Sequence, residues 1–158
     1  MAPDRDTLSG MPGPPPTPAT RPAQDGLIGR TLDGKVRLER LLGKGGTGRV
    51  YGGTQVSLGR RVAVKVMRPD LDAEDERSFE DRFFREASLA GQLQHPNIVT
   101  VHDYGRTADG VCYIVMELLG GSDLKALMKQ GPIPPARTLV IFEQIVRGLR
   151  VAHRAGLV

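Results

Sequence analysis

The chain has 158 residues, with 22 Lys and Arg against 18 Asp and Glu, which gives a formal net charge of +4. This charge is too dilute for a strong nucleic-acid or membrane footprint. The single cysteine, Cys112, excludes an internal disulfide framework and a multi-cysteine zinc site. No apolar run approaches the ~18 residues that a membrane-spanning helix needs, and the N-terminus has no secretory signal pattern. We therefore expect a reducing, cytoplasmic setting.

The first 26 residues differ in composition from the rest of the chain. Seven of the 12 prolines fall among them, and few of their side chains are apolar. Such a segment cannot bury a core, so residues 1–26 are predicted to form a disordered leader. Within it, Thr17, which precedes a proline, and Thr20 are candidate phosphorylation sites. The alternative is a solvated tail without a modification.

From Leu27 onward the residue patterns predict five strands and three helices. Alternating apolar residues indicate the strands, and a 3.6-residue apolar period indicates the helices. One helix inserted after the third strand is an α+β pattern, and most links are too short for parallel crossovers, so we expect an antiparallel sheet. Gly156 is expected to end the last helix. The expected strands cover 36–42, 49–51, 61–67, 98–102 and 111–117, and the expected helices cover 70–94, 123–129 and 136–154.

Three glycines, Gly43, Gly45 and Gly48, follow the spacing G-x-G-x-x-G. A Rossmann loop would lead into a helix, whereas a strand is expected here, and a Walker loop would place Ser or Thr directly after Lys44. Both of those interpretations fail. A glycine-rich hairpin remains, either as an ordinary turn or as a loop whose backbone N–H groups approach a phosphate.

Lys65 lies in the middle of an apolar strand, where a lysine is usually an edge or surface residue. If its face of the sheet is covered, the ammonium needs an anion. The helix at 70–94 offers one. At ~100° per residue, Glu86 falls between Phe79, Phe83, Ala90 and Leu93 within roughly 80° of arc. A carboxylate in an apolar stripe is costly unless it is paired. We therefore expect an ion pair between Lys65 and Glu86.

Taken together, these segments resemble the N-terminal lobe of a bacterial, eukaryotic-like (Hanks-type) serine/threonine protein kinase. The resemblance runs from about Leu27 to Val158. It implies a five-stranded antiparallel sheet with one αC-type helix and a hinge over residues 27–119, followed by the first helices of an incomplete C-lobe over residues 120–158. It is carried by GKGGTGRV (43–50), VAVK (62–65), REA (85–87), HPNIV (95–99) and YIVMELL (113–119).

The resemblance also implies an ATP site. In this family a glycine loop covers the phosphates, and a strand lysine, oriented by a helix glutamate, holds them. Lys65 and Glu86 match that pair, and Met116 matches the gatekeeper position. Asp123 matches the position that often meets the ribose. The implied ATP-binding residues are Leu42, Gly43, Lys44, Gly45, Gly46, Thr47, Gly48, Val50, Ala63, Lys65, Met116, Glu117, Leu119 and Asp123.

The family's catalytic-loop motif, His-Arg-Asp, should begin at residue 159. The catalytic base, the magnesium ligands and the Asp-Phe-Gly segment are absent from these 158 residues. The first hypothesis is therefore the ATP-binding portion of a kinase from a fragmentary or truncated reading frame. The intact enzyme would use ATP and Mg²⁺ to phosphorylate Ser or Thr of protein substrates, and this chain alone is expected to be inactive.

Two other classes of function were weighed. A non-catalytic module could bind nucleotide without turnover or dock on a partner, and a sharp monomer peak in size exclusion would favour it. In a truncated chain, by contrast, the helix at 136–154 would leave an uncovered apolar face. Nucleic-acid binding is disfavoured because basic and aromatic residues do not interleave. His95, His102 and His153 lack metal-ligand spacing, and Cys112 is expected in the core.

Overall fold

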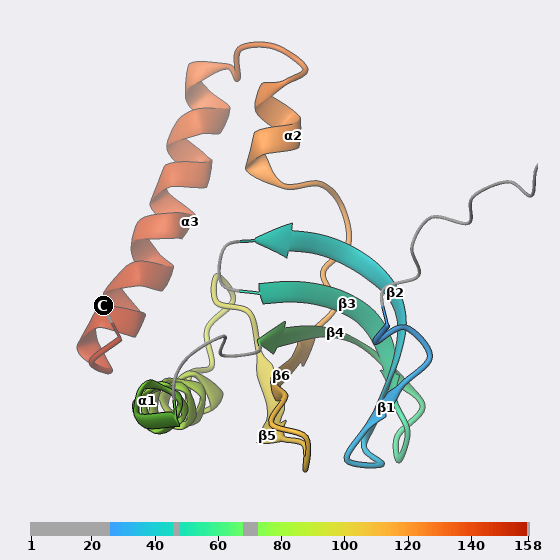
Figure 1. Cartoon of the computed structure of the whole chain (residues 1–158). Helices are drawn as coiled ribbons and strands as arrows, with labels where there is room; N and C mark the ends of the chain where they lie inside the picture. Colours follow the sequence, from blue (N-terminus) through green and yellow to red (C-terminus); the bar gives the residue numbers. More distant parts are fainter. Residues whose placement is uncertain (1–25, 46–47, 68–72, 158) are drawn as a thin grey trace, which may run out of the picture.

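Figure 1 shows the computed structural model. A strongly curved sheet has helix α1 on one side, and helices α2 and α3 lie at one end of it. The structure describes residues 26–45, 48–67 and 73–157, and the side chains of residues 73–77 are not described. The leader, with Thr17 and Thr20, therefore lies outside the described residues except for Gly26.

All pairs of neighbouring strands in the sheet are antiparallel, and the strand order is β1-β2-β3-β4-β6-β5. The strands are β1 (Thr31–Leu32), β2 (Val36–Gly45), β3 (Gly48–Gln55), β4 (Arg60–Met67), β5 (Val101–Arg106) and β6 (Cys112–Glu117). The helices are α1 (Ala73–Gly91), α2 (Leu124–Met128) and α3 (Pro135–Arg154). The antiparallel α+β fold agrees with the prediction, and the helix follows the third of the five longer strands as expected.

Four strands differ from the prediction. Strand β2 continues to Gly45 rather than ending at 42, and β3 covers Gly48–Gln55 rather than 49–51. Strand β1 was not expected, because two residues are too few to show a period of two. Strand β5 was expected at 98–102 but lies at Val101–Arg106. The residues before it form a turn instead, in which the Ile98 N–H donates to the His95 carbonyl over 3.0 Å. The apolar run at Ile98–Val99 therefore belongs to this turn.

The two faces of β4 bury different sets of side chains. Val62, Val64 and Val66 point into the hollow of the curved sheet, where they pack with buried residues of β2, β3 and β6. Ala63, Lys65 and Met67 point to the other face, as the alternation of the strand requires. The main core consists of Leu32, Val36, Leu38, Tyr51, Val62, Val64, Val66, Val111, Tyr113 and Val115.

Polar contacts join the two ends of the sheet and close its curve. The Arg30 guanidinium donates to Asp109 Oδ2 over 2.8 Å, although the two residues lie 79 positions apart. The Tyr113 hydroxyl donates to Asp33 Oδ2 over 2.8 Å, and burial together with this bond raises the pKa of Tyr113 well above its usual value. Hydrogen bonds from Arg30 and Thr107 hold the pKa of Asp109 well below its usual value.

Helix α3 begins and ends as its sequence predicts. Pro135 occupies its first turn, where a missing N–H costs nothing. At its end, Gly156 has φ 82°, and its N–H donates to His153 while the Leu157 N–H donates to Ala152. This pattern is a Schellman motif. Gly148 is the only buried residue of the helix.

Candidate nucleotide-binding site

The candidate site lies on the face of the sheet opposite the main core. The strand register brings together the side chains that the sequence predicted for it. Val50 of β3 is opposite Lys65 of β4, and Ala63 of β4 is opposite Met116 of β6. These four residues therefore occupy two adjacent rows on one face of three neighbouring strands.

Leu42 joins this group through an irregularity in β2. The pairing shifts between Leu41 and Gly43, so one extra residue is accommodated at position 42. A Cβ built on Gly52 would lie 3.6 Å from Leu42 Cδ2, and Gly52 is the register partner of Ala63. Leu42 thus reaches over the strand that carries Val50, and the apolar part of the candidate site has Leu42, Val50, Ala63 and Met116 as its walls.

The glycine-rich hairpin joins β2 to β3 beside this apolar surface. Gly48 has φ 140°, and a Cβ there would lie 2.3 Å from the Val66 carbonyl oxygen, so this position requires glycine. Gly43 and Gly45 have open space where a Cβ would stand. Gly46 and Thr47 lie outside the described residues.

Lys65 is half-buried, but the expected partner does not meet it. Among the described residues no ion pair joins Lys65 to Glu86, and Glu86 is exposed. The prediction that Glu86 sits in the middle of the apolar stripe of α1 is wrong. The helix instead buries Phe83 and Ala87, which are spaced by four residues.

The orientation of α1 follows from its contacts with the sheet. Phe83 packs with Met67 and Cys112 in a second, smaller core, which confirms Cys112 as a buried core residue. Glu80 pairs with Arg106 of β5 at 2.7 Å. This is an electrostatic contact rather than an aligned hydrogen bond, because Glu80 Oε1 has no hydrogen-bond partner within the described part of the chain. These anchors turn Glu86 toward solvent.

The segment after β6 places the remaining predicted residues at the edge of the site. The Glu117 N–H donates to the Thr100 carbonyl over 3.0 Å, and Glu117 Oε1 accepts from the Thr100 N–H over 2.7 Å. Leu119 is 63% exposed. Asp123 is the N-cap of α2 and accepts from the Ala126 N–H over 2.6 Å, a structural role that its spacing before a helix would have indicated.

The histidines have surroundings that suit structural roles. His95 Nδ1 accepts from the Asn97 N–H over 3.2 Å, a local bond within the turn before β5. Burial and the nearby charge of Arg60 lower the pKa of His102, while Glu117 opposes the shift. Within residues 26–45, 48–67 and 73–157 no three His, Cys, Asp or Glu side chains gather into a possible metal site, and no helix is long and apolar enough to cross a membrane.

Comparison with known proteins decides the family. The model of the protein kinase domain matches residues 36–158. This chain belongs to the protein kinase family. It is 43% identical over 136 residues to the serine/threonine-protein kinase pkn2 of Myxococcus xanthus, covering 86% of this chain and 16% of that protein. It is 42% identical to the serine/threonine-protein kinase PknA of Mycobacterium tuberculosis, covering 83% of this chain and 31% of that protein.

The fold matches solved kinase domains as well. The PknI kinase domain of M. tuberculosis superposes with a TM-score of 0.71 at 33% identity. The match covers 82% of this chain but only 51% of that one. The chain therefore holds about half of a kinase domain, with the curved sheet and α1 as the N-lobe and α2 and α3 as the start of the C-lobe.

Proposed function

We propose that this chain forms the ATP-binding portion of a serine/threonine protein kinase. The observation that carries the proposal is the gathering of Leu42, Val50, Ala63, Lys65 and Met116 on one face of three strands, beside the glycine-rich hairpin. The apolar side chains can hold a flat purine ring. Lys65 lies next to them, opposite Val50 and two residues after Ala63 on β4. An apolar surface beside a cation matches a nucleotide, in which an apolar base is followed by charged phosphates.

Each part of the site has a distinct task in this proposal. Val50 and Ala63 contact the two sides of the adenine, with Leu42 at the same wall and Met116 behind it. The Glu117 carbonyl and the Leu119 N–H bond the adenine edge. The backbone of Gly43–Gly48 covers the phosphates, and the Lys65 ammonium binds them as a point charge. Asp123 meets the ribose in addition to capping α2.

Bound ATP supplies the phosphoryl group, and in the intact enzyme Mg²⁺ neutralises the charge that develops during its transfer. The residues of this chain position the nucleotide, but the 158 residues contain neither a His-Arg-Asp nor an Asp-Phe-Gly motif. We expect this chain to bind ATP without turnover, and a longer protein with those motifs to phosphorylate Ser or Thr of its protein substrates. Glu86 pairs with Lys65 there after a rotation of α1.

Titration with a fluorescent ATP analogue tests the binding. Lys65→Met should weaken binding by about 10- to 100-fold, since one charge-assisted phosphate contact contributes roughly 1.5–3 kcal/mol. Lys129→Met, which removes an exposed lysine after α2, is the matched control and should bind as the parent chain does. Equal affinities for the two variants would contradict the assignment of Lys65.

Sequencing the source DNA past codon 158 tests the larger claim. If the frame continues into His-Arg-Asp and Asp-Phe-Gly, Lys65→Met in the full-length protein should abolish phosphoryl transfer. An adjoining sequence without those motifs would contradict the kinase assignment and leave a non-catalytic nucleotide-binding or docking module. The exposed apolar face of α3 fits the longer protein better, because such a face favours association unless it is covered.

A further inference from the structure

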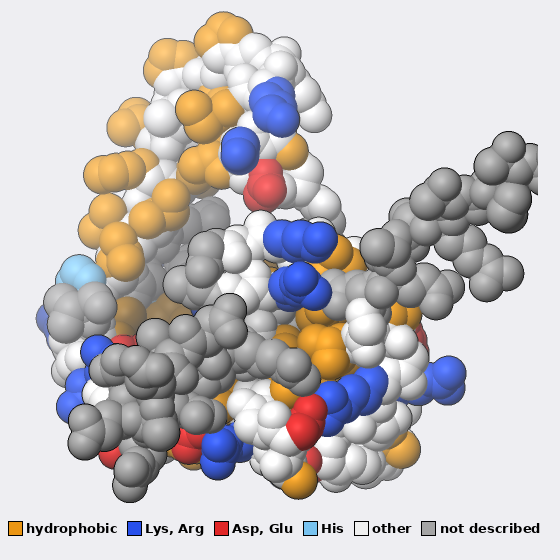
Figure 2. Space-filling view, in the orientation of Figure 1, with side chains coloured by type: hydrophobic (Ala, Val, Ile, Leu, Met, Phe, Trp, Pro, Cys, Tyr) orange, Lys and Arg blue, Asp and Glu red, His pale blue; other side chains and the backbone are white. Residues whose placement is uncertain are grey.

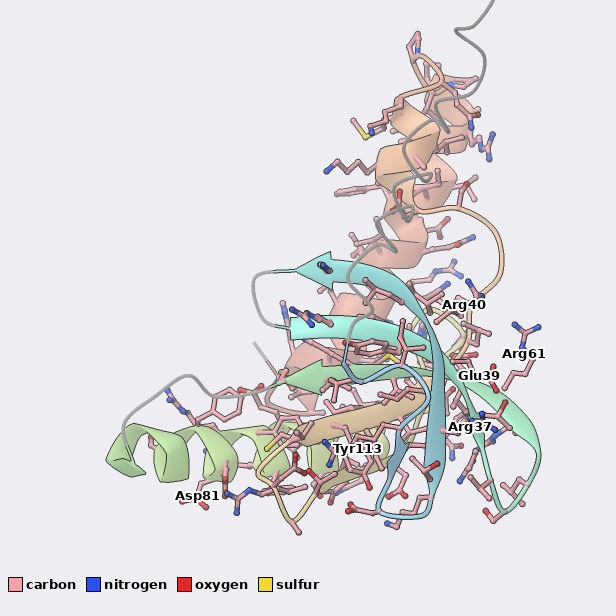
Figure 3. All side chains as sticks on the ribbon, turned by 45° about the vertical axis from the view of Figure 1, so that its right-hand side comes forward. Arg37, Glu39, Arg40, Arg61, Asp81 and Tyr113 are labelled. Atoms are coloured by element: carbon pink, nitrogen blue, oxygen red, sulfur yellow. The ribbon has the colours of Figure 1, made fainter. Side chains whose placement is uncertain are left out.

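Three arginines form a cluster on the same face of the sheet as the candidate site. Arg37 of β2 and Arg61 of β4 lie on either side of Thr54 of β3 in one row of the register. Arg40 is opposite Gly52 in the adjacent row, and a Cβ on Gly52 would lie 3.4 Å from Arg40 Cγ and Nε. Figure 3 shows the three labelled arginines on one side of the curved strands. We call Arg37, Arg40 and Arg61 the arginine cluster.

A bulge in β2 explains why two of these arginines share a face. The pairing shifts between Leu38 and Arg40, so Glu39 is an extra residue. Arg37 and Arg40 are an odd number of positions apart and would otherwise point to opposite faces. The bulge therefore concentrates positive charge on the face that carries the candidate site.

No ion pair neutralises the arginine cluster within the described part of the chain, although one carboxylate lies among its members. All three arginines are exposed, and none of their guanidinium groups takes part in an ion pair or a hydrogen bond among the described residues. Glu39 is that carboxylate: its Oε1 accepts from Thr54 Oγ1 over 2.8 Å, and Thr54 stands between Arg37 and Arg61 in the register. The three guanidinium groups and this carboxylate together leave the cluster with a positive charge. Guanidinium groups bind phosphate through paired N–H donors, so the cluster suits a phosphorylated ligand.

The N-terminal leader enters the fold directly beside this cluster. The Gly29 N–H donates to the Leu38 carbonyl over 2.8 Å, and the Leu38 N–H donates to the Arg30 carbonyl over 2.9 Å. Gly29 therefore lies against β2 between Arg37 and Arg40. Thr20 precedes Gly29 by nine residues and Thr17 by twelve. Extended chains of these lengths span about 30 and 40 Å, which is ample to reach the cluster.

Phosphorylation would supply most of the leader's complementary charge. Residues 1–25 contain three Asp and two Arg, so their side chains sum to −1. One phosphate adds about −1.5 to −2 at pH 7, together with three strong acceptor oxygens. The unmodified leader is nearly neutral overall, because its three carboxylates are largely offset by Arg5 and Arg21. A phosphate would add a second charge and a third acceptor oxygen at one position, which suits several guanidinium groups at once better than a carboxylate does.

We propose that the leader, phosphorylated at Thr17 or Thr20, docks on the arginine cluster of its own chain. A serine/threonine kinase with ATP supplies the modification. The bond from Pγ to the oxygen that leaves with ADP breaks, a bond from Pγ to the threonine oxygen forms, and the hydroxyl proton is released. Since Arg40 lies over Gly52 and Gly52 pairs with Ala63, the docked leader borders the adenine side of the nucleotide site.

The test uses the ¹⁵N-labelled 158-residue chain without nucleotide, so it does not depend on ATP binding. Synthetic peptides of residues 9–25, phosphorylated at Thr17, at Thr20 or at neither, are titrated to about 5 mM, above the millimolar effective concentration of a short tether. The phosphopeptides should shift the Nε–H resonances of the arginine cluster in a saturable way, and the unmodified peptide should not. Replacing all three arginines by Gln should weaken binding at least tenfold.

A charge-matched control separates docking from general attraction. Arg137, Arg150 and Arg154 are exposed on α3, and their replacement by Gln removes the same charge from a different surface. This variant should bind within twofold of the parent chain. The proposal is overturned if the phosphopeptides cause no saturable shift, if the control weakens binding equally, or if inorganic phosphate binds the cluster as tightly as the phosphopeptides do.

Discussion

The sheet and helix α3 differ in where they place their apolar side chains. Leu38 in the sheet is fully buried, whereas Leu139 on α3 is 69% exposed. Figure 2 shows hydrophobic side chains gathered along α2 and α3. An apolar groove of about 560 Å³ lies between those two helices. The exposed apolar residues of α3 are Leu139, Val140, Phe142, Ile145, Val146 and Leu149.

The difference in burial indicates which part of the chain is stable without further contacts. The sheet encloses ten buried residues of its own, and its two ends are joined by polar contacts. Helix α3 is capped at its C-terminal end by the Schellman motif but buries only Gly148. A Cβ built on Gly148 would lie 2.8 Å from the Asn97 carbonyl oxygen. Capping and propensity shape a helix, but burial supplies most of its stability in a folded protein. We expect the N-lobe sheet to fold as the stable unit of this chain.

The same substitution in the two regions should give the largest difference. Leu38→Ala removes buried methyl groups and leaves a cavity, so it should lower the free energy of unfolding by about 2–5 kcal/mol. Leu139→Ala touches an exposed side chain and should change it by less than about 0.5 kcal/mol. Urea unfolding of both variants, followed by circular dichroism, makes the comparison. Similar losses would mean that α3 is buried in solution.

A second pair compares two glycines of one hairpin. Gly48→Ala should cost about 2 kcal/mol, because its φ of 140° is unfavourable for alanine and the new Cβ would meet the Val66 carbonyl. Gly43→Ala has open space and no positive φ, so thermal unfolding should change little. An equal shift of the two melting temperatures would contradict the described hairpin geometry.

The strand pattern predicted much of this site, and tertiary contacts determined the rest. Alternation in β4 was enough to put Ala63 and Lys65 on one face, and family motifs assigned their neighbours. The bulges at Glu39 and Leu42 leave no signature in a period of two, yet they decide what faces the site. The bond from Arg30 to Asp109 joins residues 79 positions apart, and no local pattern signals it.

The wrong prediction for Glu86 has a definite physical cause. Sequence periodicity identified an apolar stripe but not its centre, since Glu86 lies only ~60° from Phe83 on a helical wheel. The pairing of Glu80 with Arg106 and the packing of Phe83 rotate the helix by enough to expose Glu86. The contacts of α1 with the sheet, rather than the sequence of the helix itself, determine its rotation about its axis when two alternatives differ by so small an angle.

Two ion pairs extend the comparison to charged groups. Glu80→Gln breaks the contact from α1 to Arg106, in which the Glu80 side chain is only 16% exposed. We expect a loss of about 1 kcal/mol. Glu143→Gln breaks an (i, i+4) pair with Arg147 in which both side chains are 61% exposed, and about 0.3–0.5 kcal/mol is typical for such pairs. Added salt should reduce the second effect more. If Glu80→Gln costs no more free energy of unfolding than Glu143→Gln, the contact of Glu80 with Arg106 stabilises α1 no more than an exposed pair does.

The smallest effect concerns the acid stability of the contact that closes the sheet. Hydrogen bonds from Arg30 and Thr107 lower the pKa of Asp109 in the folded chain, while the unfolded carboxyl keeps its usual value of about 3.9. The folded state therefore binds fewer protons, and its stability should fall as the pH drops from about 5 through that value.

Asp109→Asn should remove this part of the pH dependence and leave a flatter curve of unfolding free energy between about pH 5 and 3. Asp81→Asn, on an exposed residue of α1 with no such partners, should keep the parent slope. If Asp109→Asn also keeps that slope, the carboxylate does not hold the two ends of the sheet together in solution, and closure rests on the bond from Tyr113 to Asp33.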